Sequence, residues 1–332
     1  MKRSDGLRSM LAGLSAAFLC AAVDASATES RERRTFAPLE TASSLDEDKV
    51  ALGKLLFSDP ILSRMQAISC SSCHDLDNGG TVKLSRAIAD DGKEHSFNAP
   101  TIFNVSANYL LGWRGKQKSL ELVTEKVLLD SRLMAADWSL LATRLKDSRL
   151  YSSWFSHIYR QGPNRTNVLD ALVTFQRSLV TPNSRFDQYL RGDTSALTPS
   201  EHRGLSLFMS YGCASCHQGI NLGGNMRQMF GLFPDPGEIP APGNATPLTA
   251  LSDSSEATVF RVPSLRNVAV TGPYFHDGRV DSLLDAVSIM AQRQLGQTLA
   301  AADAEAIVAF LKTLTGEYDG RTLERSTTLD QR

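Results

Sequence analysis

Cysteine, long apolar runs and any excess of one charge are all scarce in this chain. Its 332 residues include five cysteines and nearly equal numbers of basic and acidic side chains, 35 and 36, for a net charge near −1. A near-neutral chain has no broad positive field, so we expect no nucleic-acid partner. After the first 27 residues no stretch approaches the roughly 20 apolar residues that a membrane-spanning helix needs, so we expect no membrane span.

The first 27 residues have the pattern of a secretory signal peptide. Three basic residues precede a mostly apolar stretch, 10–23, and Ala25-Ser26-Ala27 has the small residues of a cleavage site. Cys20 lies inside this leader and follows Leu19 rather than a small residue, which disfavours a lipid anchor. We therefore expect the mature protein to be exported.

The other four cysteines are all used in two copies of one motif. Cys70-Ser-Ser-Cys73-His74 recurs as Cys213-Ala-Ser-Cys216-His217. In this spacing both thiols can form thioethers with the vinyl groups of a haem, and the imidazole that follows can bind the iron. The sequence thus predicts two covalently bound c-type haems with His74 and His217 as proximal ligands, and covalent haem on an exported chain indicates a bacterial periplasm.

Three other uses of these cysteines are less consistent with the pattern. A four-cysteine zinc site usually has its two pairs about 15 to 20 residues apart, whereas Cys73 and Cys213 are separated by 140 positions. A redox Cys-x-x-Cys does not require a histidine directly after it, and here the histidine occurs twice. Structural disulfides would leave both histidines unexplained.

The two halves of the chain share more than the cysteine motif. The segment Asn98-Ala-Pro-Thr-Ile-Phe-Asn104 matches Arg261-Val-Pro-Ser-Leu-Arg-Asn267 at an offset of 163 positions. The same offset pairs Val127 of the first half with Met290 of the second. We interpret the chain as a duplicated unit in which the second copy has a thioether where the first has a branched hydrocarbon.

Apolar periodicity predicts a mainly α-helical fold. We expect helices over 46–57, 135–159, 167–179 and 302–314, and another that begins at Thr198-Pro199-Ser-Glu201 because this pattern is typical of a helix start. Residues 221–255 have no periodicity and predict a long surface excursion. The expected division is a signal peptide at 1–27, an irregular segment at 28–45, a first haem domain at 46–182, a second at 183–320 and a polar tail at 321–332.

Longer motifs accompany the two haem sites. They are Leu52-Gly-Lys-Leu-Leu-Phe-Ser-Asp-Pro60, Phe186-Asp-Gln-Tyr-Leu190, Asn221-Leu-Gly-Gly224, Pro273-Tyr-Phe-His-Asp-Gly278 and Ile307-Val-Ala-Phe-Leu-Lys-Thr-Leu-Thr-Gly316. In this order they resemble the bacterial di-haem cytochrome c peroxidases, a family that includes MauG-like oxidases of a partner protein. The resemblance extends over about residues 46–317.

The resemblance implies two tandem class I cytochrome c-like domains. One haem meets hydrogen peroxide, and the other receives electrons from a small periplasmic donor, a cytochrome c or a cupredoxin. It also suggests a homodimer. Met290 matches the methionine that, with His217, holds the electron-transfer haem in the peroxidases, whereas MauG-like enzymes have tyrosine there. Without the repeat and the resemblance, Met290 reads as a core residue of a helical stripe, and Met209, Met226 and Met229 are rival ligands.

Two further assignments depend on the resemblance. Trp113 matches a tryptophan between the haems that is proposed to relay electrons, although an unassigned tryptophan is as often a core aromatic. Asn98, Thr271 and Pro273 match oxygen donors of a calcium site near the contact of the two haems. Alternatively, these three residues only stabilise ordinary loops and turns.

The sequence departs from the family where peroxide reacts. The family's distal histidine matches Asp90, and no histidine is in register, so we expect haem 1 to be five-coordinate or water-bound. His95, five residues later in a polar loop, is the alternative resting ligand. The catalytic glutamate and its neighbouring glutamine fall on Leu133 and Leu129, and neither leucine can transfer a proton.

Asp130 and Asp137 are the nearest substitutes for the missing acid, although carboxylates in an exposed helix are usually only solvated. Two functions besides the peroxidase therefore stay open. One is an electron-transfer or sensing protein with weak or no turnover, and the other is a MauG-like oxidase of a protein partner.

Overall fold

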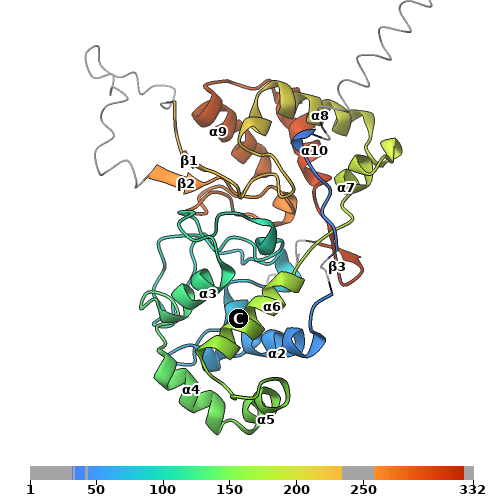
Figure 1. The fold of residues 1–332 in the computed structure, drawn as a ribbon. Helices are drawn as coiled ribbons and strands as arrows, with labels where there is room; N and C mark the ends of the chain where they lie inside the picture. The colour runs from blue at the N-terminus through green and yellow to red at the C-terminus, as the bar shows by residue number, and fades with distance from the viewer. Residues whose placement is uncertain (1–31, 33, 42–43, 234–257, 325–332) are drawn as a thin grey trace, which may run out of the picture.

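The protein has two helical lobes, one above the other in Figure 1. The computed structural model describes residues 32, 34–41, 44–233 and 258–324. The predicted signal peptide and most of the predicted excursion lie outside these residues. The described helices are α2 (Glu47–Ser58), α3 (Leu120–Leu129), α4 (Trp138–Asp147), α5 (Arg149–Ile158), α6 (Arg165–Ser178), α7 (Arg185–Leu190), α8 (Pro199–Ser210), α9 (Leu283–Leu295) and α10 (Ala301–Lys312).

The strands are short and form two separate antiparallel pairs. β1 (Arg227–Met229) pairs with β2 (Val259–Arg261), and β3 (Glu317–Tyr318) pairs with β4 (Arg321–Thr322). The second pair includes the first residues of the expected polar tail. The mainly α-helical class predicted from periodicity is confirmed. Within the described residues no helix is long and apolar enough to cross a membrane.

Two predicted helix starts are confirmed by their caps. The Asp46 carboxylate accepts a hydrogen bond from the backbone N–H of Lys49 over 3.1 Å and begins α2. At α8, Thr198 and Glu201 form a reciprocal capping box, and Pro199 occupies the first turn. These side chains satisfy N–H groups that have no partner inside the helix, which is why the sequence marks the boundary.

The prediction of a single helix over 135–159 is wrong, because the helix is interrupted at Ser148. This residue has extended backbone angles and is both the C-cap of α4 and the N-cap of α5, where its hydroxyl accepts from the N–H of Tyr151. The break lets both helices turn an apolar side to the same core, Leu141 and Leu145 from α4 and Phe155 from α5. A serine can offer the backbone a local alternative to helical hydrogen bonding.

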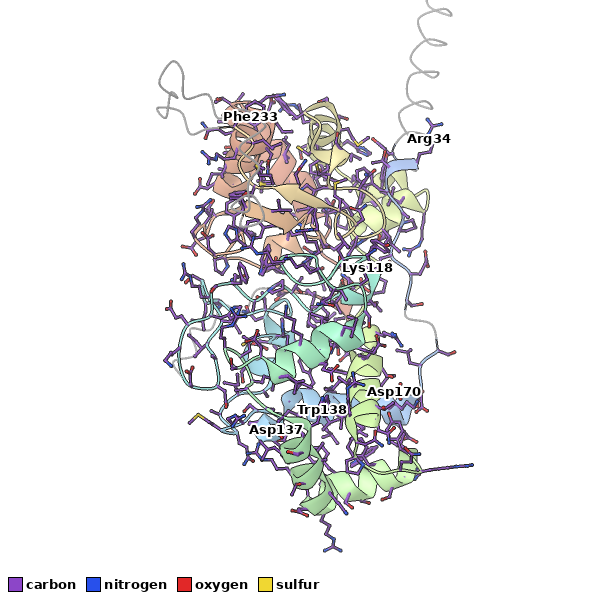
Figure 2. All side chains as sticks on the ribbon, turned by 60° about the vertical axis from the view of Figure 1, so that its left-hand side comes forward. Arg34, Lys118, Asp137, Trp138, Asp170 and Phe233 are labelled. Carbon is purple, nitrogen blue, oxygen red and sulfur yellow. The ribbon has the colours of Figure 1, made fainter. Side chains whose placement is uncertain are left out.

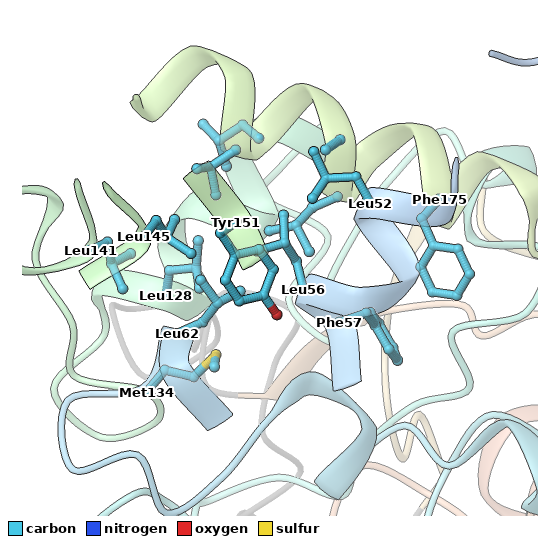
Figure 3. Packing of buried hydrophobic residues seen from close by; sticks show 14 of the residues in the cluster. Leu52, Leu56, Phe57, Leu62, Leu128, Met134, Leu141, Leu145, Tyr151 and Phe175 are labelled. Atoms are coloured by element: carbon cyan, nitrogen blue, oxygen red, sulfur yellow. The ribbon is translucent and has the colours of Figure 1, made fainter. Parts of the chain in front are cut away.

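Each lobe is built on one close crossing of two helices. In the first lobe α2 crosses α6, and both helices contribute side chains to the apolar core drawn in Figure 3. A Cβ added at Gly53 would lie 2.2 Å from the carbonyl oxygen of Ala171. In the second lobe α8 crosses α10, and a Cβ at Gly204 would meet the carbonyl of Ala306. Both crossings therefore require glycine, and the two lobes repeat one packing arrangement.

The internal repeat recurs in the local backbone as well. Asn104 and Asn267, 163 positions apart, both adopt the left-handed conformation, with φ of 58° and 62°. Both side-chain amides donate to the hydroxyl of Thr181, over 2.7 and 2.9 Å. Thr181 thus joins equivalent points of the two lobes and fixes how one lobe sits on the other.

The two ends of the chain cross over between the lobes. Near the N-terminus, Phe36 joins the core of the second lobe, and the N–H of Leu39 donates to Asp187. Asp187 also forms an ion pair of 2.8 Å with Arg266, and both side chains are fully buried. Near the C-terminus, Tyr318 packs on Phe103 of the first lobe with ring centroids 4.9 Å apart.

The start of the predicted surface excursion is buried instead. Asn221 and Leu222 are both 0% exposed, and the amide of Asn221 donates to Asn108 of the first lobe over 2.7 Å. We interpreted the glycine and asparagine of this segment as signs of a surface loop. At its start they instead let the backbone approach the other lobe. Residues 234–255 of the excursion lie outside the described part.

Candidate functional site

The first Cys-x-x-Cys-His motif forms a tight turn under α2. Residues Cys70–Ser72 make one 3-10 turn, and the N–H of His74 donates to the carbonyl of Cys70 over 2.9 Å. The Nδ1 atom of His74 lies 3.4 Å from the carbonyl oxygen of Gly80, and the carbonyl of Pro100 also interacts with the ring. With Nδ1 held by carbonyls, Nε2 keeps its lone pair for a metal.

The second motif repeats this arrangement. Cys213–Ser215 form the same turn, and the N–H of His217 donates to Cys213 over 3.0 Å. The Nδ1 atom of His217 lies 3.2 Å from the carbonyl of Leu222, and the carbonyl of Pro263, the repeat partner of Pro100, interacts with the ring. Burial lowers the pKa of His217 to about 4, so the imidazole is neutral near pH 7, the form in which it binds metals.

The four motif thiols have the environment of attachment points rather than of redox cysteines. All four are free and partly buried. Burial raises the pKa of Cys70 to about 12 and that of Cys213 to about 11. A redox Cys-x-x-Cys normally has a lowered pKa, because the thiolate is the reactive form. Two unpaired thiols followed by a neutral imidazole with a free Nε2 fit a haem in each lobe.

Met290 and Val127 occupy matching places in matching helices. Ser119 caps α3 and Ser282 caps α9, again 163 positions apart. Val127 is half-buried and packs against the core of the first lobe, and Met290 is half-buried in α9. Helices α3 and α9 are therefore equivalent elements of the two lobes. Val127 and Met290 can be compared directly because they lie at the same position of these helices.

Trp113 lies at the junction of the lobes. Its indole N–H donates to the backbone carbonyl of Asn98 over 2.7 Å, and its own carbonyl accepts from the N–H of Arg261 of the second lobe over 2.7 Å. The ring meets His276 edge-on at 6.4 Å, and the carbonyl of His276 accepts from the N–H of Asn98. Trp113 thus contacts both lobes, and its predicted role as an electron relay stays a prediction.

The predicted calcium residues lie on the same junction. Asn98 is buried, and its amide donates to the carbonyl of Leu84 over 2.9 Å. Thr271 follows the short helical turn Val268–Val270, and Pro273 follows a cis peptide bond. A Cβ at Gly79 of the first lobe would lie 2.8 Å from the carbonyl of Val270, so this turn of the second lobe contacts the first directly.

The expected peroxide side of the first lobe contains a cavity of about 330 Å³. It is lined by Arg64, Met65, Asp90, Asp91, Leu129, Ser131, Ala135 and Ala136. Asp90 is only 5% exposed, and its carboxylate accepts from the N–H groups of Met65 and Ala67 over 2.6 and 3.3 Å. Its own N–H donates to the carbonyl of Leu133. Asp90 therefore fixes the loop that leads into the first haem motif.

His95 and Asp130 lie near each other at the edge of this region. The Nδ1 atom of His95 accepts from the N–H of Phe97 over 3.2 Å, and burial, followed by the nearby Arg132, lowers the pKa of His95. Asp130 forms an ion pair of 2.9 Å with Arg132, and hydrogen bonds from this arginine lower the pKa of Asp130. Asp130 is thus an ionised partner of an arginine.

Asp137 is the N-cap of α4. Its carboxylate accepts from the hydroxyl of Ser139 and from the N–H of Leu140, and these bonds lower its pKa. In Figure 2 it lies low on the first lobe, away from the junction near which Lys118 lies. Its described contacts are those of a helix cap.

The sequence reasoning missed the cluster of cations and aromatic rings at the junction. His276 stacks on Phe260 at 4.0 Å, and the guanidinium of Arg114 lies 4.3 Å from the same ring. A second cavity, of about 580 Å³, is lined by Arg86, Ser96, Phe97, Arg114, Lys126, Arg132, Phe260, His276 and Asp277. The motif Pro273-Tyr-Phe-His-Asp-Gly278 contains two of these residues, His276 and Asp277, but gave no sign of the surrounding cations and rings.

This geometry defines a duplicated helical protein with one candidate haem site in each lobe. A family model described as di-haem cytochrome c peroxidase matches residues 47–195. A cytochrome c551 peroxidase of Pseudomonas aeruginosa is 38% identical over 278 residues, which cover 82% of this chain and 80% of that protein. The chain belongs to the di-haem cytochrome c peroxidase family and is an oxidoreductase of the peroxidase type.

Other relatives extend the comparison to the MauG branch. The methylamine utilization protein MauG of Methylorubrum extorquens is 32% identical over 264 residues, covering 78% of this chain and 73% of that protein. A crystal structure of a MauG-like protein associated with microbial copper homeostasis superimposes with a TM-score of 0.70 at 27% identity, covering 84% of this chain and 94% of that one.

Proposed function

We propose that this protein is a periplasmic di-haem peroxidase that reduces hydrogen peroxide to two water molecules with two electrons and two protons. Electrons come one at a time from a small c-type cytochrome or a cupredoxin. The relatives named cytochrome c peroxidases, at 35 to 38% identity over most of the chain, support this activity. The signal-peptide pattern of residues 1–27 supports the periplasm.

The observation that carries the proposal is that one histidine turn occurs twice with the same contacts. Cys70 and Cys73 hold the first haem covalently and Cys213 and Cys216 the second, with His74 and His217 as proximal ligands. The bound haems supply one iron at which peroxide is reduced and one that accepts single electrons. In both turns carbonyl groups hold Nδ1 and leave Nε2 for the metal.

The lobes divide the work because α3 and α9 carry different residues at one matched position, Val127 and Met290. Met290 in α9 gives the second haem a methionine ligand, a pairing with histidine that raises the reduction potential. Val127 at the matching place in α3 leaves the first haem without such a ligand. Trp113, which is hydrogen-bonded to both lobes, relays electrons between them. The methionine favours the peroxidase branch over the MauG branch.

A calcium ion at the junction completes the proposal. Asn98, Thr271 and Pro273 supply oxygen donors, which calcium prefers. Asn98 belongs to the first lobe and the other two to the second, so the ion would stabilise the contact between them. The tight approach of Gly79 to Val270 supports a fixed geometry there.

The proton route is the weak point of the active site. Leu129 lines the first cavity and Leu133 binds Asp90 through its carbonyl, so neither supplies an acid. Asp130 and Asp137 are the nearest substitutes in sequence, but their lowered pKa values and structural contacts favour other roles. This favours a second candidate function, electron transfer or sensing with weak turnover, since a missing acid or base commonly costs 100-fold or more.

Steady-state turnover separates the two candidates. The purified protein with two haems is given hydrogen peroxide and a reduced small cytochrome c, and oxidation of the donor is followed. Two donor molecules oxidised per peroxide support the peroxidase. Donor oxidation no faster than in a haem-free control would leave the electron-transfer or sensing function.

A further inference from the structure

Arg261 is a buried cation whose partner is missing from the described part of the chain. It is 5% exposed, and its Nε donates to the carbonyl of Gly112 over 3.1 Å. Its Nη1 atom is buried and has no hydrogen-bond partner. Within the described residues Arg261 also forms no ion pair. A guanidinium in this position is costly, because a buried charge without a counter-charge loses its hydration and gains nothing in return.

A second arginine lies directly opposite on the neighbouring strand. Arg227 of β1 is the register partner of Arg261 of β2, and residues opposite each other on antiparallel strands project to the same side of the sheet. A Cβ at Gly115 of the first lobe would lie 3.1 Å from Arg227 and 3.2 Å from Arg261, so the first lobe packs against both. Like charges directly opposite each other on paired strands are destabilising, so an anion near this pair would stabilise the sheet.

The position of Arg261 in the chain relates it to the second haem site. It lies two residues before Pro263, whose carbonyl interacts with the imidazole of His217. On its other side, its N–H donates to the carbonyl of Trp113. The backbone of Arg261 therefore lies between the second histidine turn and the tryptophan at the junction, and its guanidinium, with one unsatisfied nitrogen, lies against Gly112 beside that tryptophan. No carboxylate of the described residues pairs with this guanidinium, and the two candidates outside the described chain are a carboxylate of a bound haem and a free anion.

We propose that Arg261, supported by Arg227, forms an ion pair with a carboxylate of the haem held by the second lobe. This rests on the proposed function only in that two haems are bound. Haem carries two carboxylates, and a planar guanidinium pairs well with such a group. The pair neutralises the buried guanidinium, and the positive charge of Arg261 offsets the negative charge of that carboxylate near the metal that accepts electrons.

The test uses the complete two-haem protein with Arg261→Gln and Arg261→Lys, after both haems have been counted. A spectroelectrochemical titration gives the midpoint potential of each haem. We expect Arg261→Gln to lower the higher potential, because removal of a positive charge disfavours adding an electron, and to leave the lower one in place. Arg261→Lys should keep most of the wild-type value. Arg321→Gln, on exposed β4, is the matched control and should change neither potential.

Two results would overturn the proposal. The first is an unchanged higher potential in Arg261→Gln. The second is a free anion as the true partner, recognised when chloride or phosphate raises the unfolding temperature of the wild type but not of Arg261→Gln while both potentials stay fixed. If Arg261→Gln fails to retain haem, Arg227→Gln on the same sheet replaces it. We expect this variant to lower the higher midpoint potential by a smaller amount. An unchanged potential would contradict the proposal. Loss of peroxide turnover with both potentials as predicted would instead count against the proposed function.

Discussion

The backbone N–H of Asp90 donates to the carbonyl oxygen of Leu133 over 2.9 Å, so two segments distant in sequence meet at the edge of the first cavity. These are the positions at which the resemblance expects a distal histidine and a catalytic glutamate. The carboxylate of Asp90 is already engaged by the N–H groups of Met65 and Ala67. The place where a proton should be transferred thus contains a structural carboxylate and an apolar side chain.

Placing a carboxylate at position 133 should increase peroxidase turnover. We expect Leu133→Glu, alone or with Leu129→Gln, to raise turnover by at least about tenfold, the lower part of what a positioned acid or base contributes. Haem content and folding are confirmed first, because a carboxylate at a half-buried position costs stability. Leu122→Glu is the matched control, since Leu122 is 52% exposed on the same part of the chain. An equal increase in that control would contradict the assignment.

The second haem should depend on Met290 for its high potential. We expect Met290→Leu to retain both covalent haems, which the cysteines hold, and to lose the high-potential component of a redox titration, because methionine ligation raises the potential. Val127→Leu at the matching place should leave that component unchanged. An unaltered upper potential in Met290→Leu would show that another residue is the ligand.

Asp130 and Asp137 should prove to be structural residues rather than the catalytic acid. Asp137→Ala should lower the free energy of unfolding by about 1 kcal/mol through loss of the α4 cap, whereas Asp137→Asn keeps a good cap. Chemical denaturation measures both. Neither change, nor Asp130→Asn, should reduce turnover. A rapid wild type that loses activity in Asp137→Asn or Asp130→Asn would identify that aspartate as the acid and our alignment of this region as wrong.

The close helix crossing of the second lobe should not tolerate a side chain. Gly204→Ala places a methyl group against the carbonyl of Ala306 and forces α8 from α10, which we expect to cost about 1 to 3 kcal/mol or more, as overpacking does. Thermal unfolding of the two-haem protein gives the result. Ser206→Ala on the exposed side of α8 should be neutral, and equal losses in both variants would mean that the crossing is not the cause.

Local patterns predicted much of this structure. Thr198, Pro199 and Glu201 marked a helix start because capping is a property of a few adjacent residues. The offset of 163 positions held because equivalent residues, such as Asn104 and Asn267, keep equivalent backbone conformations.

What the sequence could not predict depends on contacts between distant segments. Ser148 breaks a stretch that remains amphipathic on both sides, so periodicity gave one helix. No local signal says that Phe36 joins the second lobe or that Tyr318 returns to the first. An arginine is normally exposed, and only the structure reveals that Arg261 is buried at the junction with an unpartnered nitrogen.

The most direct test of the account is the oxidation of a reduced small cytochrome c by hydrogen peroxide, measured side by side for the wild type and Leu133→Glu, each with two covalent haems. The account predicts slow, peroxide-dependent donor oxidation in the wild type, with two donors used per peroxide, and a rate at least about tenfold higher in the variant. Donor oxidation that is absent in both proteins although both haems are present and reducible would contradict it.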